Sequence, residues 1–463
     1  MSEYAFLREI TGGERVSVEG HARAEHAGDW GTDPEDERDP DAVVWPASTA
    51  EVSAVLAAAD ERGLPVTPYA AGTALEGHVV PAEGGITMDL SRMDAILDVR
   101  PDDLQVDVQP GVIGSDVDER VARHGLFFPP LPSSGDISTI GGMIATDASG
   151  MGTVRYGEVG DWVLGLEAVL PDGTVITTGS RARKTSAGYN LGDLLVGSEG
   201  TLGVVTRATL ELAGRPQQIR GGRAVFSDLG DAAGAVFDAV RSGVDVAKIE
   251  LVDGLSATMA NAYLDEDLPE KPMVFVEFHA DHGIEEEIDF CRTVFREYDP
   301  AAFELADDDR MDDLWRARRE MAYAIEEYRA GMRSLHPGDV TVPISALREI
   351  VTYAKTRGEA EGLLVPCYGH AGDGNLHYTV LVDPDDAEMV ERAEAVYADV
   401  VERALELGGT ATGEHGVGQG KREYLPKEHG AAAVETMRTI KRALDPNGTL
   451  NPGKVLPERD GDR

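Results

Sequence analysis

The chain has 463 residues, 42% of them hydrophobic, so it is long enough for two or three globular domains and too apolar for a disordered protein. Its 84 acidic and 42 basic residues leave a net charge of −42, which argues against a surface made to bind nucleic acid or anionic membranes. The only two cysteines, Cys291 and Cys367, exclude a disulfide scaffold and a cysteine-ligated iron–sulfur cluster within the chain, and we expect both to be small buried hydrophobic residues.

The acidic residues are spread along the whole chain instead of forming a tail. We interpret this as a surface suited to high salt, because salt screens repulsion between like charges; the alternative is an acidic protein that works in ordinary salt. No stretch approaches the roughly 18 apolar residues that span a bilayer, and the first residues do not resemble a secretory signal. We therefore expect a cytoplasmic protein without a transmembrane segment.

The first half of the chain reads as short strands, helices and glycine-rich loops. Little periodicity is visible before residue 40, and Arg215-Pro216 resembles a boundary. Ser48-Thr-Ala-Glu51 has a capping-box pattern and predicts a helix that stops at Gly63. The predicted strands are Pro65–Tyr69, a hairpin of Val163–Leu170 with Thr174–Thr178, and Val204–Leu212.

Three glycine-rich tracts each adjoin a predicted strand or helix: Ala70–Gly77, Thr139–Gly150 and Val196–Gly203. Glycine lets backbone N–H groups approach a phosphate or a ring closely. None of the tracts has the spacing of a Rossmann or a Walker motif. The tracts favour a nucleotide cofactor held by extended backbone, but do not name it.

The second half alternates strands with amphipathic helices, which predicts an α+β fold with helices over an antiparallel sheet; a parallel sheet is not excluded. The predicted strands are Ala224–Phe226, Lys248–Val252, Met273–Phe278, Phe303–Leu305, Leu363–Tyr368 and His377–Val382. The predicted helices are Asp231–Ser242, Ile284–Tyr298, Asp309–Tyr328 and Pro384–Leu407.

Two histidines flank the turn in His370-Ala-Gly-Asp-Gly-Asn-Leu-His377, and a third follows in Gly413-Glu-His-Gly416. Two histidines and one carboxylate are a common set of divalent-metal ligands, so we predict that His370, His377 and Glu414 bind Zn, Mn or Fe. His415 would then be available to move a proton. We expect Asp373 and Asn375 to stabilise the turn instead of binding metal. A single one of these histidines, taken alone, would be interpreted as structural, so the prediction depends on the whole set.

At this point the chain resembles the FAD-linked oxidases of the D-lactate dehydrogenase and glycolate-oxidase-subunit type, in the vanillyl-alcohol-oxidase superfamily. The matching motifs run from residue 41 to residue 454. They are Ala71–Gly77, Thr139–Thr146, Arg181–Tyr189, Gly197–Gly203, His370–His377, Thr412–Gly418 and Leu450–Lys454.

The resemblance implies a two-part FAD-binding domain in residues 1–216 (core about 38–216), a substrate or cap domain with an antiparallel sheet and the metal site in residues 217–440, and a segment at 441–463 that returns to the FAD domain. It implies non-covalent FAD, held by Ala71, Gly72, Thr73, Ala74, Leu75, Gly77, Pro132, Thr139, Gly141, Gly142, Ala145, Thr146, Ser149, Gly150, Glu199, Gly200, Val205 and Asn451. Two positions need comment. Asp147 stands where relatives usually carry Asn, and His78 could link covalently to flavin in some members of the superfamily, which we do not expect here.

The same resemblance implies a metal at His370, His377 and Glu414, His415 as the catalytic base and Arg318 as the group that binds the substrate carboxylate. The expected reaction is oxidation of a small D-2-hydroxy acid, D-lactate first. Because no haem or cluster motif is present, the expected electron acceptor is external, a cytochrome, a quinone or an electron-transfer flavoprotein, and it could hold the enzyme at a membrane surface. A homodimer is compatible with the sequence.

Three alternatives stay open. The substrate could be glycolate or D-2-hydroxyglutarate. The chain could be a non-catalytic subunit of a flavoprotein complex, although the intact set of histidines and glutamate argues against this. It could also be an alkyl-transferring flavoenzyme of the same superfamily.

Overall fold

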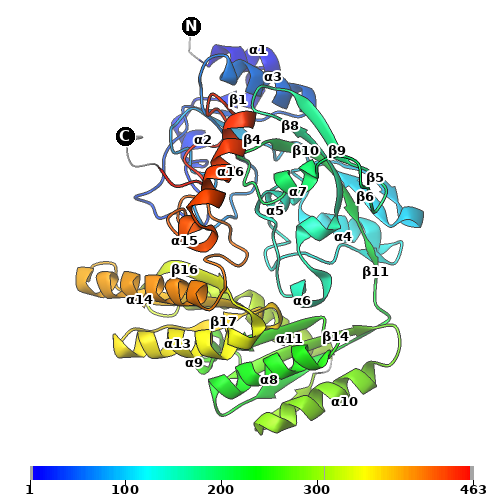
Figure 1. Cartoon of the computed structure of the whole chain (residues 1–463), viewed down its shortest axis with the longest axis vertical. Coiled ribbons are helices and arrows are strands. Elements are labelled where there is room, and N and C mark those ends of the chain that lie inside the picture. Colours follow the sequence, from blue (N-terminus) through cyan, green and yellow to red (C-terminus); the bar gives the residue numbers. More distant parts are fainter. Residues whose placement is uncertain (1–3, 307, 459–463) are drawn as a thin grey trace. The chain divides into compact units, whose positions relative to one another are not determined.

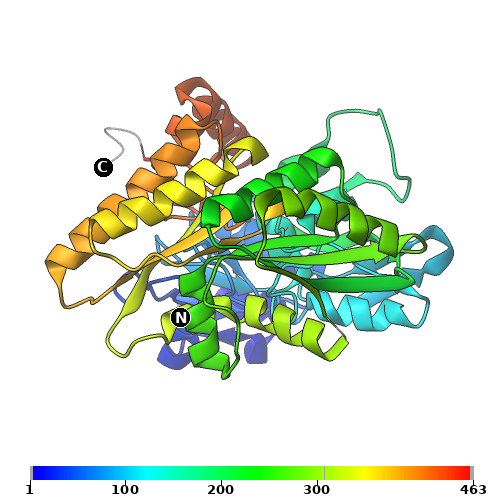
Figure 2. The ribbon, with the colours of Figure 1, turned by 90° about the horizontal axis from the view of Figure 1, so that it is seen from below.

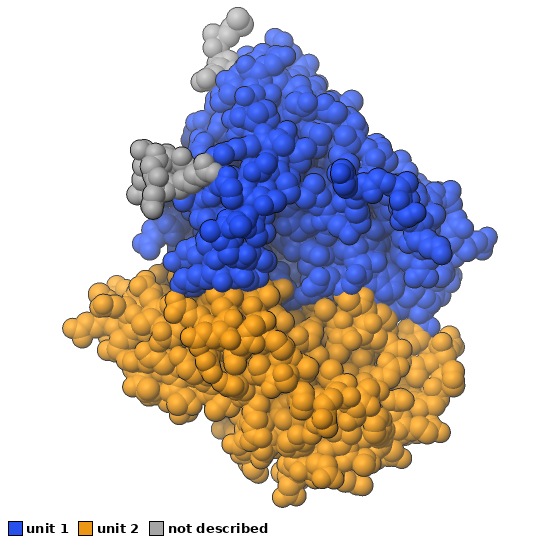
Figure 3. Space-filling view, viewed as in Figure 1, with its two compact units in different colours: residues 1–149, 158–215, 414–463 blue, residues 150–157, 216–413 orange. Residues whose placement is uncertain are grey.

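The computed structural model of the protein describes residues 4–306 and 308–458. The chain forms two compact units (Figure 3). Unit 1 comprises residues 1–149, 158–215 and 414–463, and unit 2 comprises residues 150–157 and 216–413. The domain ranges expected from the sequence, 1–216, 217–440 and 441–463, stay a prediction.

Unit 1 contains a four-stranded sheet, a five-stranded sheet and a two-stranded ribbon. The four-stranded sheet has the order β1-β2-β4-β3, with parallel pairing of β2, β4 and β3; the five-stranded sheet is antiparallel, with the order β5-β6-β10-β8-β9. Strands β8, β9 and β10 can be followed side by side in Figure 1. The strands are β1 (Val16–Ser17), β2 (Ala42–Val44), β3 (Val66–Tyr69), β4 (Ile86–Asp89), β5 (Ile96–Arg100), β6 (Gln105–Val108), β7 (Leu126–Phe127), β8 (Val163–Val169), β9 (Val175–Gly179), β10 (Val204–Glu211) and β11 (Ala213–Gly214).

The helices of unit 1 are α1 (Ala5–Thr11), α2 (Gly20–Ala24), α3 (Thr49–Asp60), α4 (Gly114–Ala122), α5 (Ile140–Thr146), α7 (Leu191–Leu195), α15 (Leu425–His429) and α16 (Ala431–Leu444). Buried residues of α1 and α3 contribute to one hydrophobic core, and buried residues of α4, α5 and α7 contribute to a second. Ser48 caps α3 as predicted, because its side chain accepts the Glu51 N–H. The predicted hairpin is confirmed by the antiparallel pairing of β8 with β9.

The first forty residues, where the sequence shows little periodicity, include the short helices α1 and α2 and strand β1. Helix α1 places Leu7 in the core, fully buried against α3 and the four-stranded sheet. Seven residues are too few for a periodicity to be read from the sequence, so packing decides this helix.

Unit 2 is built on a seven-stranded sheet with the order β15-β12-β14-β13-β17-β18-β16, and every strand pair in it is antiparallel. This confirms the predicted fold class and removes the parallel alternative for this unit. The strands are β12 (Gln218–Val225), β13 (Lys248–Val252), β14 (Met273–Ala280), β15 (Ala302–Leu305), β16 (Arg333–Thr341), β17 (Cys367–Gly369) and β18 (Asn375–Val382). The helices are α6 (Thr153–Tyr156), α8 (Leu229–Ser242), α9 (Gly254–Leu264), α10 (Ile284–Phe295), α11 (Asp308–Arg319), α12 (Met321–Glu326), α13 (Leu347–Ala360) and α14 (Ala387–Glu406).

The two faces of this sheet differ in character. Helices α8, α10, α13 and α14 lie together over one face (Figure 2). Successive side chains of a strand point to opposite faces, and opposed residues of neighbouring strands share a face. On the other face, Lys248 opposes Glu277, and His377 opposes both Tyr368 and Asp339. This second face therefore carries a row of polar side chains.

Both cysteines are fully buried and unpaired, as expected. Burial raises the pKa of each thiol to about 12, so neither is a nucleophile at neutral pH. Among residues 4–306 and 308–458, no helix has both the length and the apolar character needed to cross a membrane.

Candidate active site

The three glycine-rich tracts of the sequence lie in unit 1, except for Gly150 at the end of the second tract. The first follows β3, the second contains α5, and the third precedes β10. Gly72 and Gly77 have φ values of +65° and +71°, which a residue with a Cβ adopts only with strain. At Gly141 an added Cβ would lie 2.6 Å from the side chain of Pro110. Glycine is therefore required at these positions by backbone shape or by close packing.

Hydrogen bonds through Glu199 and Asn451 join the three tracts. The Glu199 N–H donates to Ala145 O at 2.7 Å, which ties the third tract to the second. The Asn451 amide nitrogen donates to Glu199 O at 2.8 Å and to His78 O at 3.2 Å, which ties the third tract to the end of the first. Residues far apart in sequence thus form one backbone-rich cradle within unit 1.

The cradle contains buried polar atoms that suit a polar cofactor. Asn451 is 3% exposed, and its side-chain oxygen has no hydrogen-bond partner among the described residues. Buried polar groups are normally bonded, so this atom fits a site built for a bound polar molecule. A dinucleotide with ring and phosphate groups matches such a cradle of backbone amides.

The residues predicted to hold FAD are distributed over this region. Ala71–Gly77 lie in the loop after β3, Pro132 lies after β7, and Asn451 follows α16. The side chain of Val205 on β10 packs in the hydrophobic core. The remaining predicted contacts are Thr139, which caps α5; Gly141, Gly142, Ala145 and Thr146 within α5; Ser149 and Gly150 after it; and Glu199 and Gly200 before β10. Of the whole set, only Gly150 groups with unit 2. Their contacts with a cofactor stay a prediction.

His78 and Glu199 form a buried ion pair beside Gly416. His78 Nε2 lies 3.3 Å from Glu199 Oε2, and both side chains are about 5% exposed. Burial alone would lower the pKa of His78, but the charge and hydrogen bond of Glu199, together with the charges of Asp29 and Glu76, outweigh burial and raise that pKa. A Cβ on Gly416 would lie 2.6 Å from His78 Nε2, so only glycine fits against this pair. The sequence pattern around His78 gave no signal for this pairing, and His78 was expected to matter only as a possible link to flavin.

His415, the predicted base, is held within unit 1 by its neighbours in the chain and by Glu76. The N–H groups of Val417 and Gly418 donate to the Glu199 carboxylate at 2.6 and 2.8 Å, which fixes the backbone after His415. His415 Nδ1 lies 3.9 Å from Glu76 Oε1, and that same oxygen lies 3.3 Å from the Lys421 ammonium. The Glu76 carboxylate therefore lies near the imidazole, at a distance that allows a charge interaction but is too long for a hydrogen bond.

In unit 2, Arg318 and His370 meet at one buried carboxylate, that of Glu250. Arg318 Nε donates to Glu250 Oε2 at 2.6 Å, and His370 Nδ1 lies 2.8 Å from Glu250 Oε1. Glu250 on β13 is 0% exposed, and Arg318 and His370 are 4% exposed. The guanidinium also lies over the Tyr368 ring, at 4.7 Å from its centroid.

His377 lies next to His370 on the same polar face. Their ring centroids are 5.2 Å apart and their planes are nearly perpendicular, at 88°. His377 Nδ1 lies 3.8 Å from Asp339 Oδ1. Asp339 is fully buried, and its Oδ2 accepts the Gly413 N–H at 2.8 Å. Two imidazoles side by side, each backed by a carboxylate, are chemically suited to a divalent metal.

The third predicted ligand, Glu414, belongs to unit 1, where its carboxylate accepts from the Ser149 hydroxyl at 3.2 Å. It follows Gly413 directly in the chain, but its place in a metal site stays a prediction. The turn before His377 matches expectation at Asp373, whose carboxylate accepts the Asn375 N–H. Asn375 itself differs, because its side chain donates across the sheet to Asp339 at 2.7 Å.

Sequence reasoning missed Glu250, Asp339 and Glu76, the carboxylates that hold the predicted residues. Glu250 had a readable signal, since it is a charged residue in the otherwise apolar run Ile249–Val252, and burial of an unpaired charge is costly. Such a charge implies a partner. The pattern could not say which partner.

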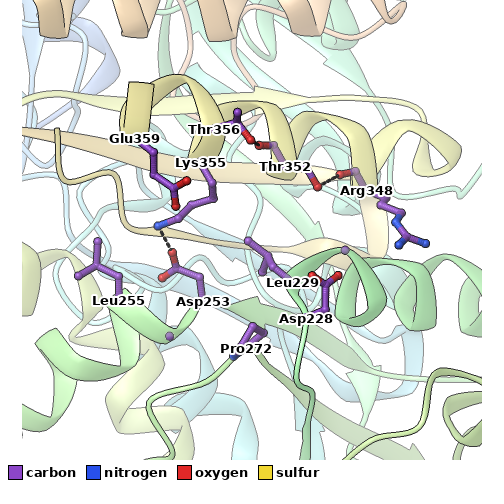
Figure 4. A pocket seen from close by; sticks show the side chains of 12 residues that line it. Asp228, Leu229, Asp253, Leu255, Pro272, Arg348, Thr352, Lys355, Thr356 and Glu359 are labelled. Carbon is purple, nitrogen blue, oxygen red and sulfur yellow. Dashed lines mark hydrogen bonds and ion pairs between the residues drawn. The ribbon is translucent and has the colours of Figure 1, made fainter. Parts of the chain in front are cut away.

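A cavity of about 480 Å³ lies elsewhere in unit 2, between the starts of α8 and α9 and helix α13 (Figure 4). None of its lining residues is a predicted site residue. Three of its charged groups have structural contacts: Asp228 and Asp253 cap the two helices, and Lys355 pairs with Asp253. We therefore assign it no function.

Comparison with known proteins places these features in context. A profile described as FAD linked oxidases, C-terminal domain, matches residues 215–455, and one described as FAD binding domain matches residues 40–179. A probable mitochondrial D-lactate dehydrogenase of Danio rerio is 38% identical over 97% of this chain and 90% of its own length. A mitochondrial D-lactate dehydrogenase (cytochrome) of Arabidopsis thaliana is 39% identical over 90% of this chain and 74% of its own length. The glycolate oxidase subunit GlcD of Bacillus subtilis is 35% identical over 90% of this chain and 89% of its own length.

Solved structures share the fold at low sequence identity. A p-cresol methylhydroxylase superposes with a TM-score of 0.81 at 17% identity, covering 99% of this chain and 96% of that one. A 4-ethylphenol oxidase from Gulosibacter chungangensis gives 0.78 at 20% identity, with coverage of 98% and 97%. An alkyldihydroxyacetonephosphate synthase gives 0.74 at 20% identity, with coverage of 98% and 86%.

Proposed function

Because the chain belongs to the family of FAD-linked oxidases, we propose that it oxidises a small D-2-hydroxy acid, with D-lactate as the first candidate, to the 2-oxo acid. The observation that carries the proposal is the pairing of Arg318 with His370 at Glu250, beside His377. It supplies a carboxylate-binding cation next to two metal-type imidazoles, as a 2-hydroxy acid requires. The relatives named D-lactate dehydrogenase support the same substrate class.

The protein residues have separate roles in this proposal. Arg318 binds the substrate carboxylate through charge-assisted hydrogen bonds. His370 and His377, completed by Glu414, hold a divalent metal, which when bound would polarise the substrate hydroxyl and orient it. His415 accepts the hydroxyl proton, and the Glu76 carboxylate stabilises the imidazolium that forms.

FAD, when bound in the cradle of unit 1, would supply the redox chemistry by taking up the C2 hydrogen with its two electrons. The proton goes to His415, so the products are the 2-oxo acid and reduced cofactor. The electrons then pass to an external acceptor. The relatives named D-lactate dehydrogenase (cytochrome) support a cytochrome as this acceptor. The cytoplasmic location and the homodimer stay predictions.

A second candidate substrate is glycolate, which the similarity to a glycolate oxidase subunit favours. Glycolate has the same carboxylate and hydroxyl groups but lacks the methyl group of lactate. D-2-hydroxyglutarate carries a second carboxylate and would need another cation. The alkyl-transfer alternative is supported only by a shared fold.

Stopped-flow reduction of the purified yellow protein tests the proposal directly. D-lactate, L-lactate, glycolate and D-2-hydroxyglutarate are mixed with it anaerobically, and loss of flavin absorbance is followed; elemental analysis is done in parallel. We expect fast bleaching with D-lactate, slow or no bleaching with L-lactate, and about one divalent metal per chain. A colourless or metal-free protein that none of the acids reduces would instead indicate the non-catalytic alternative.

A further inference from the structure

The side chain of Glu250 in unit 2 is bonded to both Arg318 and His370. We propose that Glu250 is a positioning residue that sets the ring tautomer of His370 and the orientation of Arg318 at the same time. This inference rests on the proposed function, since it assigns a purpose to the carboxylate behind the metal-binding and carboxylate-binding groups.

The first step concerns the proton on His370. A carboxylate oxygen can only accept a hydrogen bond, so the short contact of 2.8 Å between Glu250 Oε1 and His370 Nδ1 requires a hydrogen on Nδ1. Arg318 Nη2 also lies near Nδ1, at 3.4 Å, but an arginine nitrogen can only donate. The shorter contact, that with Glu250, therefore determines that Nδ1 carries the hydrogen. With hydrogen on Nδ1, the neutral ring carries its lone pair on Nε2, where it can bind a metal.

The second step concerns the guanidinium. An arginine binds a carboxylate bidentately either through Nε and one Nη or through both Nη atoms. Glu250 Oε2 occupies Nε at 2.6 Å, so a substrate carboxylate has to approach the end formed by Nη1 and Nη2. The Tyr368 ring, at 4.7 Å, holds the plane of the guanidinium from one side. Glu250 thereby selects one orientation of the bound acid.

The third step compares Glu250 with a neighbouring carboxylate of the same kind. Glu277 on the adjacent strand β14 is 4% exposed, and it also contacts a histidine, His279, and a cation, Lys248, each at 2.8 Å. Glu277 and Glu250 are therefore alike in burial and in the type of their partners. Only Glu250 touches residues that are proposed to bind metal and substrate, so Glu277 provides a matched control for a purely structural role.

Glu250→Gln is the decisive variant. A glutamine has one accepting oxygen and one donating NH₂ group, so it cannot accept from both partners. The oxygen should turn to the charged Arg318, because a charge-assisted bond is the stronger one. The NH₂ group then donates to His370 Nδ1, which moves the ring hydrogen to Nε2 and blocks metal binding through that atom.

The experiment measures divalent-metal affinity by calorimetric titration of the metal-stripped flavoprotein with Zn²⁺ and Mn²⁺, together with KM and kcat for D-lactate. We expect Glu250→Gln to lose about 10–100-fold in metal affinity. Glu277→Gln should keep the wild-type affinity and KM. Circular dichroism and the flavin spectrum show whether each variant is folded and loaded with FAD, whose predicted cradle lies in unit 1.

Glu250→Asp tests the role of Glu250 if the glutamine variant does not fold. Aspartate retains two accepting oxygens on a shorter side chain, so metal affinity should be higher than in Glu250→Gln, while KM for D-lactate should rise relative to wild type. Equal metal affinities in Glu250→Gln and Glu277→Gln, or an aspartate variant that binds metal no better than the glutamine variant, would overturn the inference. A wild-type protein that neither binds metal nor is reduced by 2-hydroxy acids would overturn the proposed function itself.

Discussion

Glu250 and Asp339 show how single carboxylates organise unit 2 at the scale of residues. Each is fully buried and contacts one histidine of the proposed metal set, His370 or His377. A buried charge is tolerated only when partners satisfy it, so these carboxylates and imidazoles hold each other in place. Functional groups are thereby oriented before any ligand arrives, which is a condition for efficient binding and catalysis.

His415 can be tested as the base by replacement with alanine. We expect Glu76 and Lys421 to remain in place, since they contact each other, while proton removal is lost. The rate of flavin reduction by D-lactate should fall by roughly 10²–10⁴-fold in single-turnover measurements. His21→Ala is the control, because His21 is exposed and should not affect the rate. An unchanged rate in His415→Ala would exclude the role of base.

Asp107 predicts a pH dependence of stability in unit 1. Burial would raise the pKa of this carboxyl, but hydrogen bonds from Arg100, Thr209 and Arg207 outweigh burial and lower the pKa to about 2. A group whose pKa is lower in the folded state adds stability above its unfolded pKa, and this stability is lost as the pH falls towards the folded pKa. Asp107→Asn should therefore lower the free energy of unfolding by about 2 kcal/mol at pH 7.

The gap between wild type and Asp107→Asn should shrink as the pH falls from about 4 to about 2, when both are followed by urea denaturation. Asp98→Asn is the matched control, since exposed Asp98 also contacts Arg100, at 2.6 Å. Removal of an exposed partner should cost less than about 1 kcal/mol. A gap for Asp107→Asn that stays constant with pH would contradict the assignment.

Helix α9 depends, at the scale of elements, on a buried cap. Asp253 accepts the Ser256 N–H at 2.7 Å, and its other oxygen lies 2.5 Å from the Lys355 ammonium of α13. Figure 4 marks the contact between Asp253 and Lys355 with a dashed line. Lys355 also donates to Val365 O. Lys355→Met removes the cation and leaves the Asp253 carboxylate buried without it. We expect the free energy of unfolding to fall by about 3 kcal/mol, measured by thermal or urea denaturation.

Two further variants check that prediction. Adding Asp253→Asn to Lys355→Met should restore part of the lost stability, because asparagine still caps a helix without a charge. Lys271→Met, an exposed lysine of the same unit, should change stability by less than about 0.5 kcal/mol. If Lys355→Met behaves like Lys271→Met, the pair contributes nothing to the attachment of α9 to α13.

The structure differs from the predictions mainly at the ends of helices and strands. The sequence predicts one helix over Asp309–Tyr328, but α11 ends at Arg319 and α12 begins at Met321. The apolar periodicity continues through the break between the two helices, so the sequence pattern does not predict this break. Similarly, the predicted strand Leu363–Tyr368 is reduced to β17, because Pro366 has no N–H for a ladder.

The net charge of −42 makes a prediction for the whole molecule. Repulsion among so many carboxylates opposes the compact state, and 1 M salt screens this repulsion between exposed charges that are more than about 3 Å apart. We expect the midpoint of urea unfolding to rise from low to multi-molar KCl. Sucrose solutions of matched viscosity serve as the control, because sucrose does not screen charge. A stability maximum at low salt would indicate an ordinary acidic protein instead.

Local periodicity and short motifs were enough to predict the fold class, most strands, the capped helix α3 and the family, and they named candidate site residues whose roles stay predictions. They could not determine which carboxylates hold those residues. Glu250 lies 120 positions from His370 and 68 from Arg318, and the three side chains meet only through strand pairing and the packing of α11. Partners so far apart in the chain leave no local pattern, so the tautomer of His370 and the free end of Arg318 are decided by tertiary structure alone.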